Sequence, residues 1–265
     1  MKGSNTTETV AIGLDRITFP QISRPRIAPG APRTEELIRW GTNVYVYSML
    51  AHVRKVLSGL LEVARTENVP VANVISRHLF ECSAHVCYVC RRLTDCYESQ
   101  DWNDAWDVLT PAATGNLWAK KYGDKYATAG SEPTPPAADP VRIGVAISEY
   151  EQYQSKALGR AEAKDTYSLL SELSHPNAAC LQQYLEYEND GQVTIGYTES
   201  PSPLPFVNLC LIDLLQFAEK LLRWSRDLSV RPVILELMSE IARRAPKAGH
   251  SPARLNCDKL RSNQP

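Results

Sequence analysis

Two segments of the chain carry polar side chains of kinds that work in catalytic sites. The segment 167–177 (YSLLSELSHPN) places Tyr167, Ser171 and His175 on one side of a predicted helix, opposite its leucines. Histidine can give or take a proton near neutral pH, and serine and tyrosine hydroxyls can donate hydrogen bonds to a reacting group. Pro176 predicts that the helix ends at His175, which holds the imidazole at a helix C-terminus.

An earlier predicted helix shows a similar polar stripe. At about 100° per residue, Arg77, Glu81, His85, Tyr88 and Arg92 fall within about 80° of one another. Arg77 and Glu81 form an i,i+4 pair of opposite charge, and an arginine can also clamp a phosphate. The solvated face of an amphipathic helix would explain this stripe equally well. Its tyrosine, histidine and arginine side chains nevertheless favour partial burial. Each carries a polar group at the end of an apolar portion that can pack against other side chains.

Taken together, SRHLFE at 76–81 and YSLLSELSHP at 167–176 resemble a bacterial all-helical family of unknown function. That family has an Arg-x-x-x-Glu pair on an early helix and a later Tyr-x-x-Leu-Ser-x-x-x-His segment. The resemblance covers residues 35–230, and it implies that Arg77, Glu81, Tyr167, Ser171 and His175 meet in one polar cluster between helices.

More distantly, the chain resembles the HEPN-type helical domains of bacterial toxins and defence ribonucleases. Those domains carry an Arg–polar–x(4–6)–His motif on a single helix, whereas no arginine precedes His175 at that distance. The formal match from Arg244 to His250 lies in a Pro- and Gly-containing tail. The departure from the motif weakens the case for ribonuclease chemistry.

Cofactor and metal motifs were sought along the whole chain. The segment HVCYVC at 85–90 suggests zinc, but Cys82, Cys87 and Cys90 fall on the apolar face of the helix, which favours core packing. A carboxylate-type metal site from Glu81, Glu172 and His175 is weaker still, because Glu172 projects about 60° away from His175. The sequence has no P-loop, G-x-G-x-x-G, G-x-S-x-G or H-E-x-x-H motif, so we expect no cofactor and no bound metal.

Bulk composition indicates a soluble cytoplasmic protein. The chain of 265 residues is 43% hydrophobic and has a net charge of −1, which argues against a whole-chain nucleic-acid or membrane-surface binder. Its most apolar window, 206–222, contains three charged residues and predicts a buried helix, not a membrane span. Seven cysteines, an odd number, are typical of thiols kept reduced inside the cell.

The residues that could do chemistry must be positioned by helices. Hydrophobic periodicity predicts helices over 34–66, 71–97, 141–164, 178–188, 206–227 and 230–244, with shorter helices in 101–121 broken by Pro111 and Gly115. The segment 189–197 has a turn signal followed by strand-like alternation. We therefore expect an all-α fold, an irregular helical bundle of about six to eight helices with one small hairpin or extended flap.

Composition divides the chain into three parts. Residues 1–33 are predicted to be disordered or extended, and residues 34–244 to form a single helical domain with an internal loop at 122–140. Residues 245–265 form a basic tail, predicted to be disordered, which could touch nucleic acid.

Two functions follow from these observations. The first is an interaction protein that binds an unknown protein or RNA partner, or a second copy of itself as a homo-oligomer, and is held together by the polar cluster. The alternative is a metal-independent ribonuclease or toxin-like defence effector. There, His175 would act as general acid or base, Arg77 would stabilise charge on the phosphate, and Glu81 or Tyr167 would orient them, with Ser171 beside them.

Overall fold

The computed structural model describes residues 4–23, 25, 32–66, 68–114, 141–159, 161–174, 185–187, 193–195 and 204–244. Within these residues the chain forms an all-α bundle, as predicted, together with one pair of short strands. The elements are α1 (Ser4–Asp15), α2 (Glu35–Arg65), α3 (Val69–Ser99), α4 (Trp102–Thr114), α6 (Ile143–Leu158), α7 (Ala163–Ser174), β1 (Leu185–Tyr187), β2 (Val193–Ile195), α9 (Leu204–Trp224) and α10 (Arg231–Arg244).

The two longest helices, α2 and α3, begin at side chains that cap them. The hydroxyl of Thr34 accepts a hydrogen bond from the backbone N–H of Leu37 at 3.3 Å, and Glu35 and Glu36 occupy the positive end of the α2 dipole. Asn68 caps α3 by accepting from the N–H of Val71 at 3.4 Å. Both caps satisfy donors that the first helical turn leaves without a partner.

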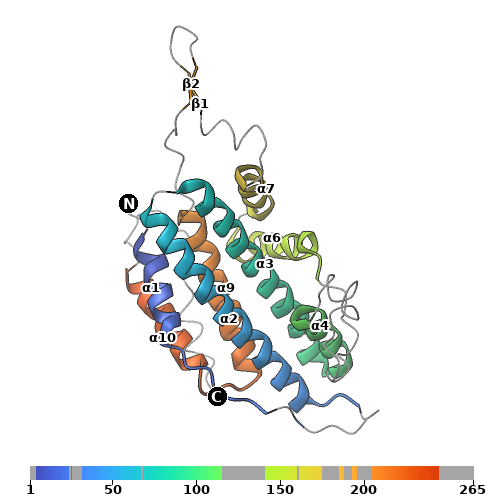
Figure 1. Ribbon diagram of the computed structural model, residues 1–265. Coiled ribbons are helices and arrows are strands. Elements are labelled where there is room, and N and C mark those ends of the chain that lie inside the picture. The colour runs from blue at the N-terminus through green and yellow to red at the C-terminus, as the bar shows by residue number, and fades with distance from the viewer. Residues whose placement is uncertain are drawn as a thin grey trace, which may run out of the picture.

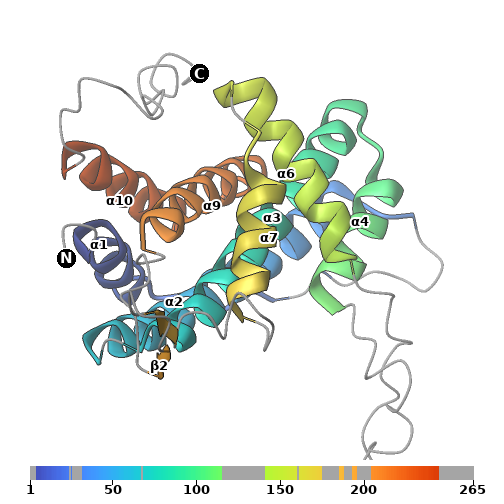
Figure 2. The ribbon, with the colours of Figure 1, turned by 90° about the horizontal axis from the view of Figure 1, so that it is seen from above.

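Helix α3 lies at the centre of the bundle. It packs against α2, α4, α6, α7 and α9, and the views in Figures 1 and 2 show it between α2 on one side and the α6–α7 pair on the other. Leu79, Val86, Val89 and Leu93 of α3 are fully buried in the core. Figure 1 shows α2 and α3 side by side and antiparallel. Hydrogen bonds from Tyr45 to His85 and from His52 to His78 join side chains of the two helices.

The N-terminal residues differ from the prediction. The expectation of an extended or disordered segment over 1–33 is wrong for residues 4–15, which form α1 and pack against α2, α9 and α10. Val10 and Leu14 recur at helical spacing and are buried, and the Thr7 hydroxyl donates to Asn208 of α9 at 2.6 Å. The threonines that suggested an extended chain are therefore compatible with a packed helix, because burial of the apolar face outweighs their weak helix propensity.

Three further local predictions are corrected. Pro111 lies inside α4 and does not interrupt it. Gly159 adopts a left-handed conformation (φ 65°) and ends α6, so the helix predicted over 141–164 is divided into α6 and the start of α7. Residues 185–187, expected at the end of a helix over 178–188, form β1, which pairs antiparallel with β2. The predicted loop at 122–140 and the basic tail at 245–265 lie outside the described residues.

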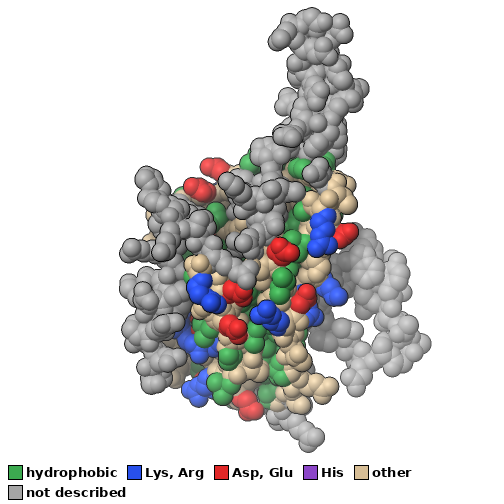
Figure 3. Space-filling model, turned by 90° about the vertical axis from the view of Figure 1, so that its left-hand side faces the viewer, with side chains coloured by type: hydrophobic (Ala, Val, Ile, Leu, Met, Phe, Trp, Pro, Cys, Tyr) green, Lys and Arg blue, Asp and Glu red, His purple; other side chains and the backbone are tan. Residues whose placement is uncertain are grey.

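The surface carries charges of both signs. On the face seen in Figure 3, lysine and arginine side chains alternate with aspartate and glutamate side chains, with apolar side chains between them. None of the described helices is long and apolar enough to cross a membrane.

Candidate metal centre

Arg77 of α3 joins α7 to its own helix. Its Nε donates to Glu81 Oε1 at 3.1 Å, and its Nη2 donates to the Tyr167 hydroxyl of α7 at 3.0 Å. The guanidinium carbon also lies 5.2 Å from the centre of the Tyr167 ring, a cation–π distance. Arg77 and Glu81 are each about a quarter exposed, so the cluster formed by Arg77, Glu81 and Tyr167 lies at the edge of the core.

Ser171 and His175 do not complete this cluster. The Ser171 hydroxyl is buried on α7 and has no hydrogen-bond partner among the described residues. His175 lies outside the described residues. Of the five residues that the sequence analysis groups together, the structure therefore joins Arg77, Glu81 and Tyr167.

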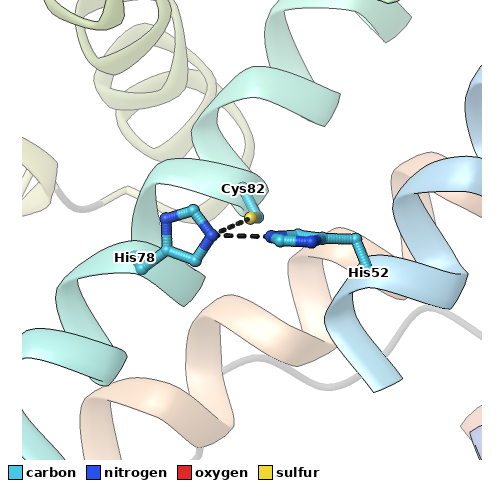
Figure 4. A group of neighbouring side chains, drawn as sticks. All are labelled: His52, His78 and Cys82. Carbon is cyan, nitrogen blue, oxygen red and sulfur yellow. Dashed lines mark hydrogen bonds between the residues drawn. The ribbon is translucent and has the colours of Figure 1, made fainter. Parts of the chain in front are cut away.

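A second group lies beside Glu81 on the α2–α3 surface. His52 of α2 and His78 and Cys82 of α3 point toward one another (Figure 4). The Nε2 atoms of the two histidines are 2.7 Å apart, and the Cys82 sulfur is 3.9 Å from His78 Nε2. All three donor atoms lie within 4.8 Å of one another. Among the described residues, this is the one group of three or more His, Cys, Asp or Glu side chains with metal-ligand spacing.

The local fold explains why these three side chains converge. His78 and Cys82 are separated by four residues, so they are neighbours along one side of α3. His52 comes from the facing part of α2, and its ring meets the His78 ring edge-on with centroids 5.0 Å apart. Both histidines are exposed, whereas Cys82 is only 6% exposed. The group thus has a buried sulfur at its base and two imidazoles open to solvent.

The two histidines contact each other through a hydrogen bond between their Nε2 atoms. The neighbouring Cys82 sulfur and Glu81 carboxylate raise the pKa of His78 to about 10. Burial, together with the charge of His78, lowers the pKa of His52. Either ring can donate the single proton of this hydrogen bond, depending on the tautomer. A metal ion bound to both nitrogens would replace this proton.

Glu81 connects the two groups. Its Oε2 lies 3.8 Å from Nδ1 of His78, an ion-pair distance, while its Oε1 accepts from Arg77. Burial acts to raise the pKa of the Glu81 carboxyl, but His78 and Arg77 together lower it, which favours the carboxylate. A carboxylate beside the far nitrogen of a ligand histidine is the usual outer partner of a metal-bound imidazole, since it fixes the ring orientation. The predicted polar cluster is thus placed to support the His52, His78 and Cys82 group.

The donor set suits zinc. Tetrahedral zinc bonds nitrogen at about 2.0–2.1 Å and sulfur at about 2.3 Å, which places two ligand nitrogens on the order of 3.3 Å apart. The observed 2.7 Å between the Nε2 atoms is shorter, as expected for a hydrogen bond, and His52 and His78 are exposed side chains that can rotate apart. To hold zinc, the two Nε2 atoms would therefore have to move apart by about 0.6 Å.

No local sequence pattern brings His52, His78 and Cys82 together. The sequence pattern groups His85 with the cysteines of 85–90, whereas His85 contacts the Tyr45 hydroxyl through Nδ1 at 2.8 Å. Cys87 and Cys90 are fully buried, as core packing predicts. The available signal was His78-x-x-x-Cys82, a ligand pair on one helix side. His52 could be added only once α2 and α3 were known to pack in this register.

Comparison of the chain with protein-family models, with curated proteins and with solved structures gave no match. The resemblance to a bacterial all-helical family, and the more distant one to HEPN-type domains, therefore stay predictions.

Proposed function

We propose that this chain binds a divalent ion of the zinc class through His52 Nε2, His78 Nε2 and Cys82 Sγ. The observation that carries the proposal is the convergence of these three donor atoms, from two helices, within 4.8 Å. The ion would link α2 to α3 on the side where Glu81 and Arg77 support the ligands.

The chemistry of the ligands selects the class of ion. Imidazole suits zinc, copper, iron and nickel, and thiolate favours the softer of these, whereas magnesium and calcium prefer oxygen ligands. Structural zinc sites are usually closed by four protein ligands. Three protein ligands leave the fourth position of a tetrahedral ion for water or for another small ligand, which is the arrangement of catalytic zinc sites.

The functions predicted from the sequence stay predictions beside this proposal. An interaction protein could use the metal to hold α2 against α3. The ribonuclease alternative assigns the acid–base role to His175, which lies outside the described residues. RNA cleavage in EDTA by the wild type and by His175→Ala would test that alternative separately, because EDTA removes the proposed metal from the comparison.

Metal analysis tests the proposal directly. The purified chain is loaded with Zn²⁺, dialysed and measured for bound zinc by elemental analysis, and its affinity is measured by competition with a chromophoric chelator. We expect one zinc per chain, and we expect Cys82→Ser and His78→Ala to lose it. His85→Gln is the matched control, since His85 lies on the same helix and bonds Tyr45 instead.

Cobalt substitution identifies the ligands. Co²⁺ bound to a thiolate gives a sulfur-to-metal charge-transfer band in the near ultraviolet, which Cys82→Ser should abolish. A chain that binds no zinc, or that binds equally with and without His78 and Cys82, would contradict the proposal.

A further inference from the structure

Helix α7 lies on the outside of the bundle. It packs on α3 and α6, and Figures 1 and 2 show it beside both helices. The side chains on its outer face are exposed to solvent: Lys164, Asp165, Ser168, Leu169 and Glu172. Helix α7 is therefore a single layer of chain over the surface that it covers.

A small cavity lies beneath the first turn of α7, with a volume of about 20 Å³. Glu162, directly before α7, and Thr166 belong to the wall on the α7 side. The opposite wall comes from α3, α6 and α9 and includes Phe80, Tyr150, Gln154 and Cys210, each at most 6% exposed. Movement of α7 away from α6 would therefore open this cavity to solvent.

The covered wall carries polar groups. The Tyr150 hydroxyl donates to the buried carboxylate of Asp213. The side-chain oxygen of Gln154 is buried without a hydrogen-bond partner among the described residues. Such an oxygen is costly in a closed cavity, and it would accept hydrogen bonds from water once the cavity opens. Exposing this wall therefore costs less free energy than exposing an apolar wall of the same size.

Little apolar surface holds α7 in place. Its buried apolar side chains are Ala163 and Leu170. The helix α10 is of similar length and buries a larger set: Ile234, Leu237, Met238 and Ile241. Elements with few buried apolar contacts open at a lower free energy than the rest of a fold. Gly159 ends α6 shortly before α7 begins, and its lack of a side chain gives this connection backbone freedom.

Polar contacts fasten α7 at two points. Arg77 of α3 donates to the Tyr167 hydroxyl at 3.0 Å, and the Tyr167 ring stacks on Phe80 with centroids 6.4 Å apart. The Lys164 ammonium lies 3.2 Å from a carboxylate oxygen of Glu151 on α6, an ion-pair distance. Partly exposed contacts of this kind contribute less than burial of large apolar side chains, so each can be broken while the bundle stays folded.

We propose that α7 is a lid. It opens from α3 and α6 as a unit while the rest of the bundle stays folded, and the contact between Arg77 and Tyr167 is the latch that holds it closed. The connection at Gly159 is the hinge. Opening gives solvent and small solutes access to the wall that carries Tyr150, Gln154 and Cys210. The lid needs no bound metal.

Thiol labelling measures the opening. Cys210 lines the cavity under α7, whereas Cys90 is equally buried and is not a lining residue. Burial raises the pKa of both thiols to about 12, so both are unreactive in the closed state. The native chain is treated with iodoacetamide at pH 8, and mass spectrometry follows each cysteine. We expect Cys210 to react faster than Cys90, because Cys90 becomes accessible only through a larger unfolding.

A variant of the latch shows whether α7 controls this access. Tyr167→Phe removes the hydroxyl that Arg77 holds and keeps the ring. It should raise the labelling rate of Cys210 by about two- to tenfold, the usual contribution of one hydrogen bond, and leave Cys90 unchanged. Tyr97→Phe is the matched control and should change neither rate. It makes the same change on α3, 20 residues or roughly 30 Å from Arg77.

Hydrogen exchange of the same variants locates the opening. The backbone amides of α7 should exchange faster in Tyr167→Phe than in the wild type, and those of α3 and α6 should not. If Tyr167→Phe does not fold, Lys164→Gln serves as the second variant, because it removes the ion pair with Glu151 at an exposed position.

Three outcomes would overturn the lid. Cys210 that reacts no faster than Cys90 in the wild type and in Tyr167→Phe would show that α7 opens only when the whole fold unfolds. A variant that accelerates both cysteines equally would have lost global stability instead of a latch. Faster labelling of Cys210 without faster exchange in α7 would place the opening in another element.

Discussion

At the residue scale, Glu81 should act on the metal without touching it. Its carboxylate faces Nδ1 of His78, so Glu81→Gln keeps the side-chain shape while removing the charge that orients the ring. Loss of such an outer partner lowers metal affinity by about 10–100-fold. We expect that loss in a chelator competition, with one zinc still bound at saturation. Glu62→Gln, on the exposed face of α2, should bind zinc like the wild type, and equal affinities for the two variants would contradict the role of Glu81.

The cysteines of α3 should differ in their reaction with iodoacetamide. Burial raises the pKa of the Cys90 thiol to about 12, and burial together with Cys90 raises the pKa of Cys87 as well. Because the thiolate is the nucleophile, a raised pKa keeps both thiols protonated and unreactive from pH 7 to pH 9. Mass spectrometry of the labelled native chain should find Cys87 and Cys90 unmodified, and should find that zinc protects Cys82. Rapid labelling of Cys90 at pH 7 would contradict its burial.

The candidate residues show which side-chain contacts can be predicted from a sequence. The i,i+4 spacing is enough to pair Arg77 with Glu81, because neighbours on one helix are set by helical geometry alone. The contact between Arg77 and Tyr167 depends on how α7 packs on α3, and it was implied only by the resemblance to a family. Neither helical spacing nor the resemblance predicted the contact made by His52. Its contact with His78 spans two helices, and no local pattern reports that register.

At the element scale, the packing of α1 on α10 depends on Gly13. A Cβ added at Gly13 would overlap the Leu237 side chain, at 2.8 Å from its Cδ2 and 3.1 Å from its Cγ, and Leu237 is buried. Gly13→Ala should therefore lower the free energy of unfolding by about 1–3 kcal/mol through overpacking, despite the better helix propensity of alanine. Gly59 on α2 is the matched control, since a Cβ there meets nothing within 4 Å.

Gly59→Ala should raise the free energy of unfolding by up to about 1 kcal/mol, because alanine costs less backbone entropy in a helix. Urea denaturation of both variants measures the two effects. A stabilising Gly13→Ala would show that α1 does not pack on α10 as described.

The helix boundaries were predictable where side chains mark them. Thr34 followed by two glutamates indicated the start of α2, and the cap is present. The end of α6 was missed, because only the left-handed conformation of Gly159 distinguishes a terminating glycine from one inside a helix. The helix α1 was missed because burial of Val10 and Leu14 against other helices stabilises it, whereas the intrinsic helix propensity of its residues is weak.

At the scale of the whole molecule, the predicted bundle followed from apolar periodicity, since each long amphipathic helix needs partners that cover its apolar face. The central place of α3 could not be predicted in the same way. Periodicity gives the width of an apolar stripe but not the number of helices that cover it, and five of the described helices pack on α3.

The metal should stabilise the fold as a whole. The three proposed ligands are brought together only when α2 and α3 are packed, so the folded chain would bind the ion far more tightly than the unfolded chain. Free zinc at about 100 times its Kd should therefore add about 2.7 kcal/mol to the free energy of unfolding. Thermal denaturation with zinc and with EDTA measures this difference as a shift in Tm. His52→Ala separates linkage from nonspecific binding, because it removes the ligand that α2 supplies while leaving His78 and Cys82 on α3. A zinc-dependent rise in Tm that persists in His52→Ala would place the bound ion elsewhere in the chain.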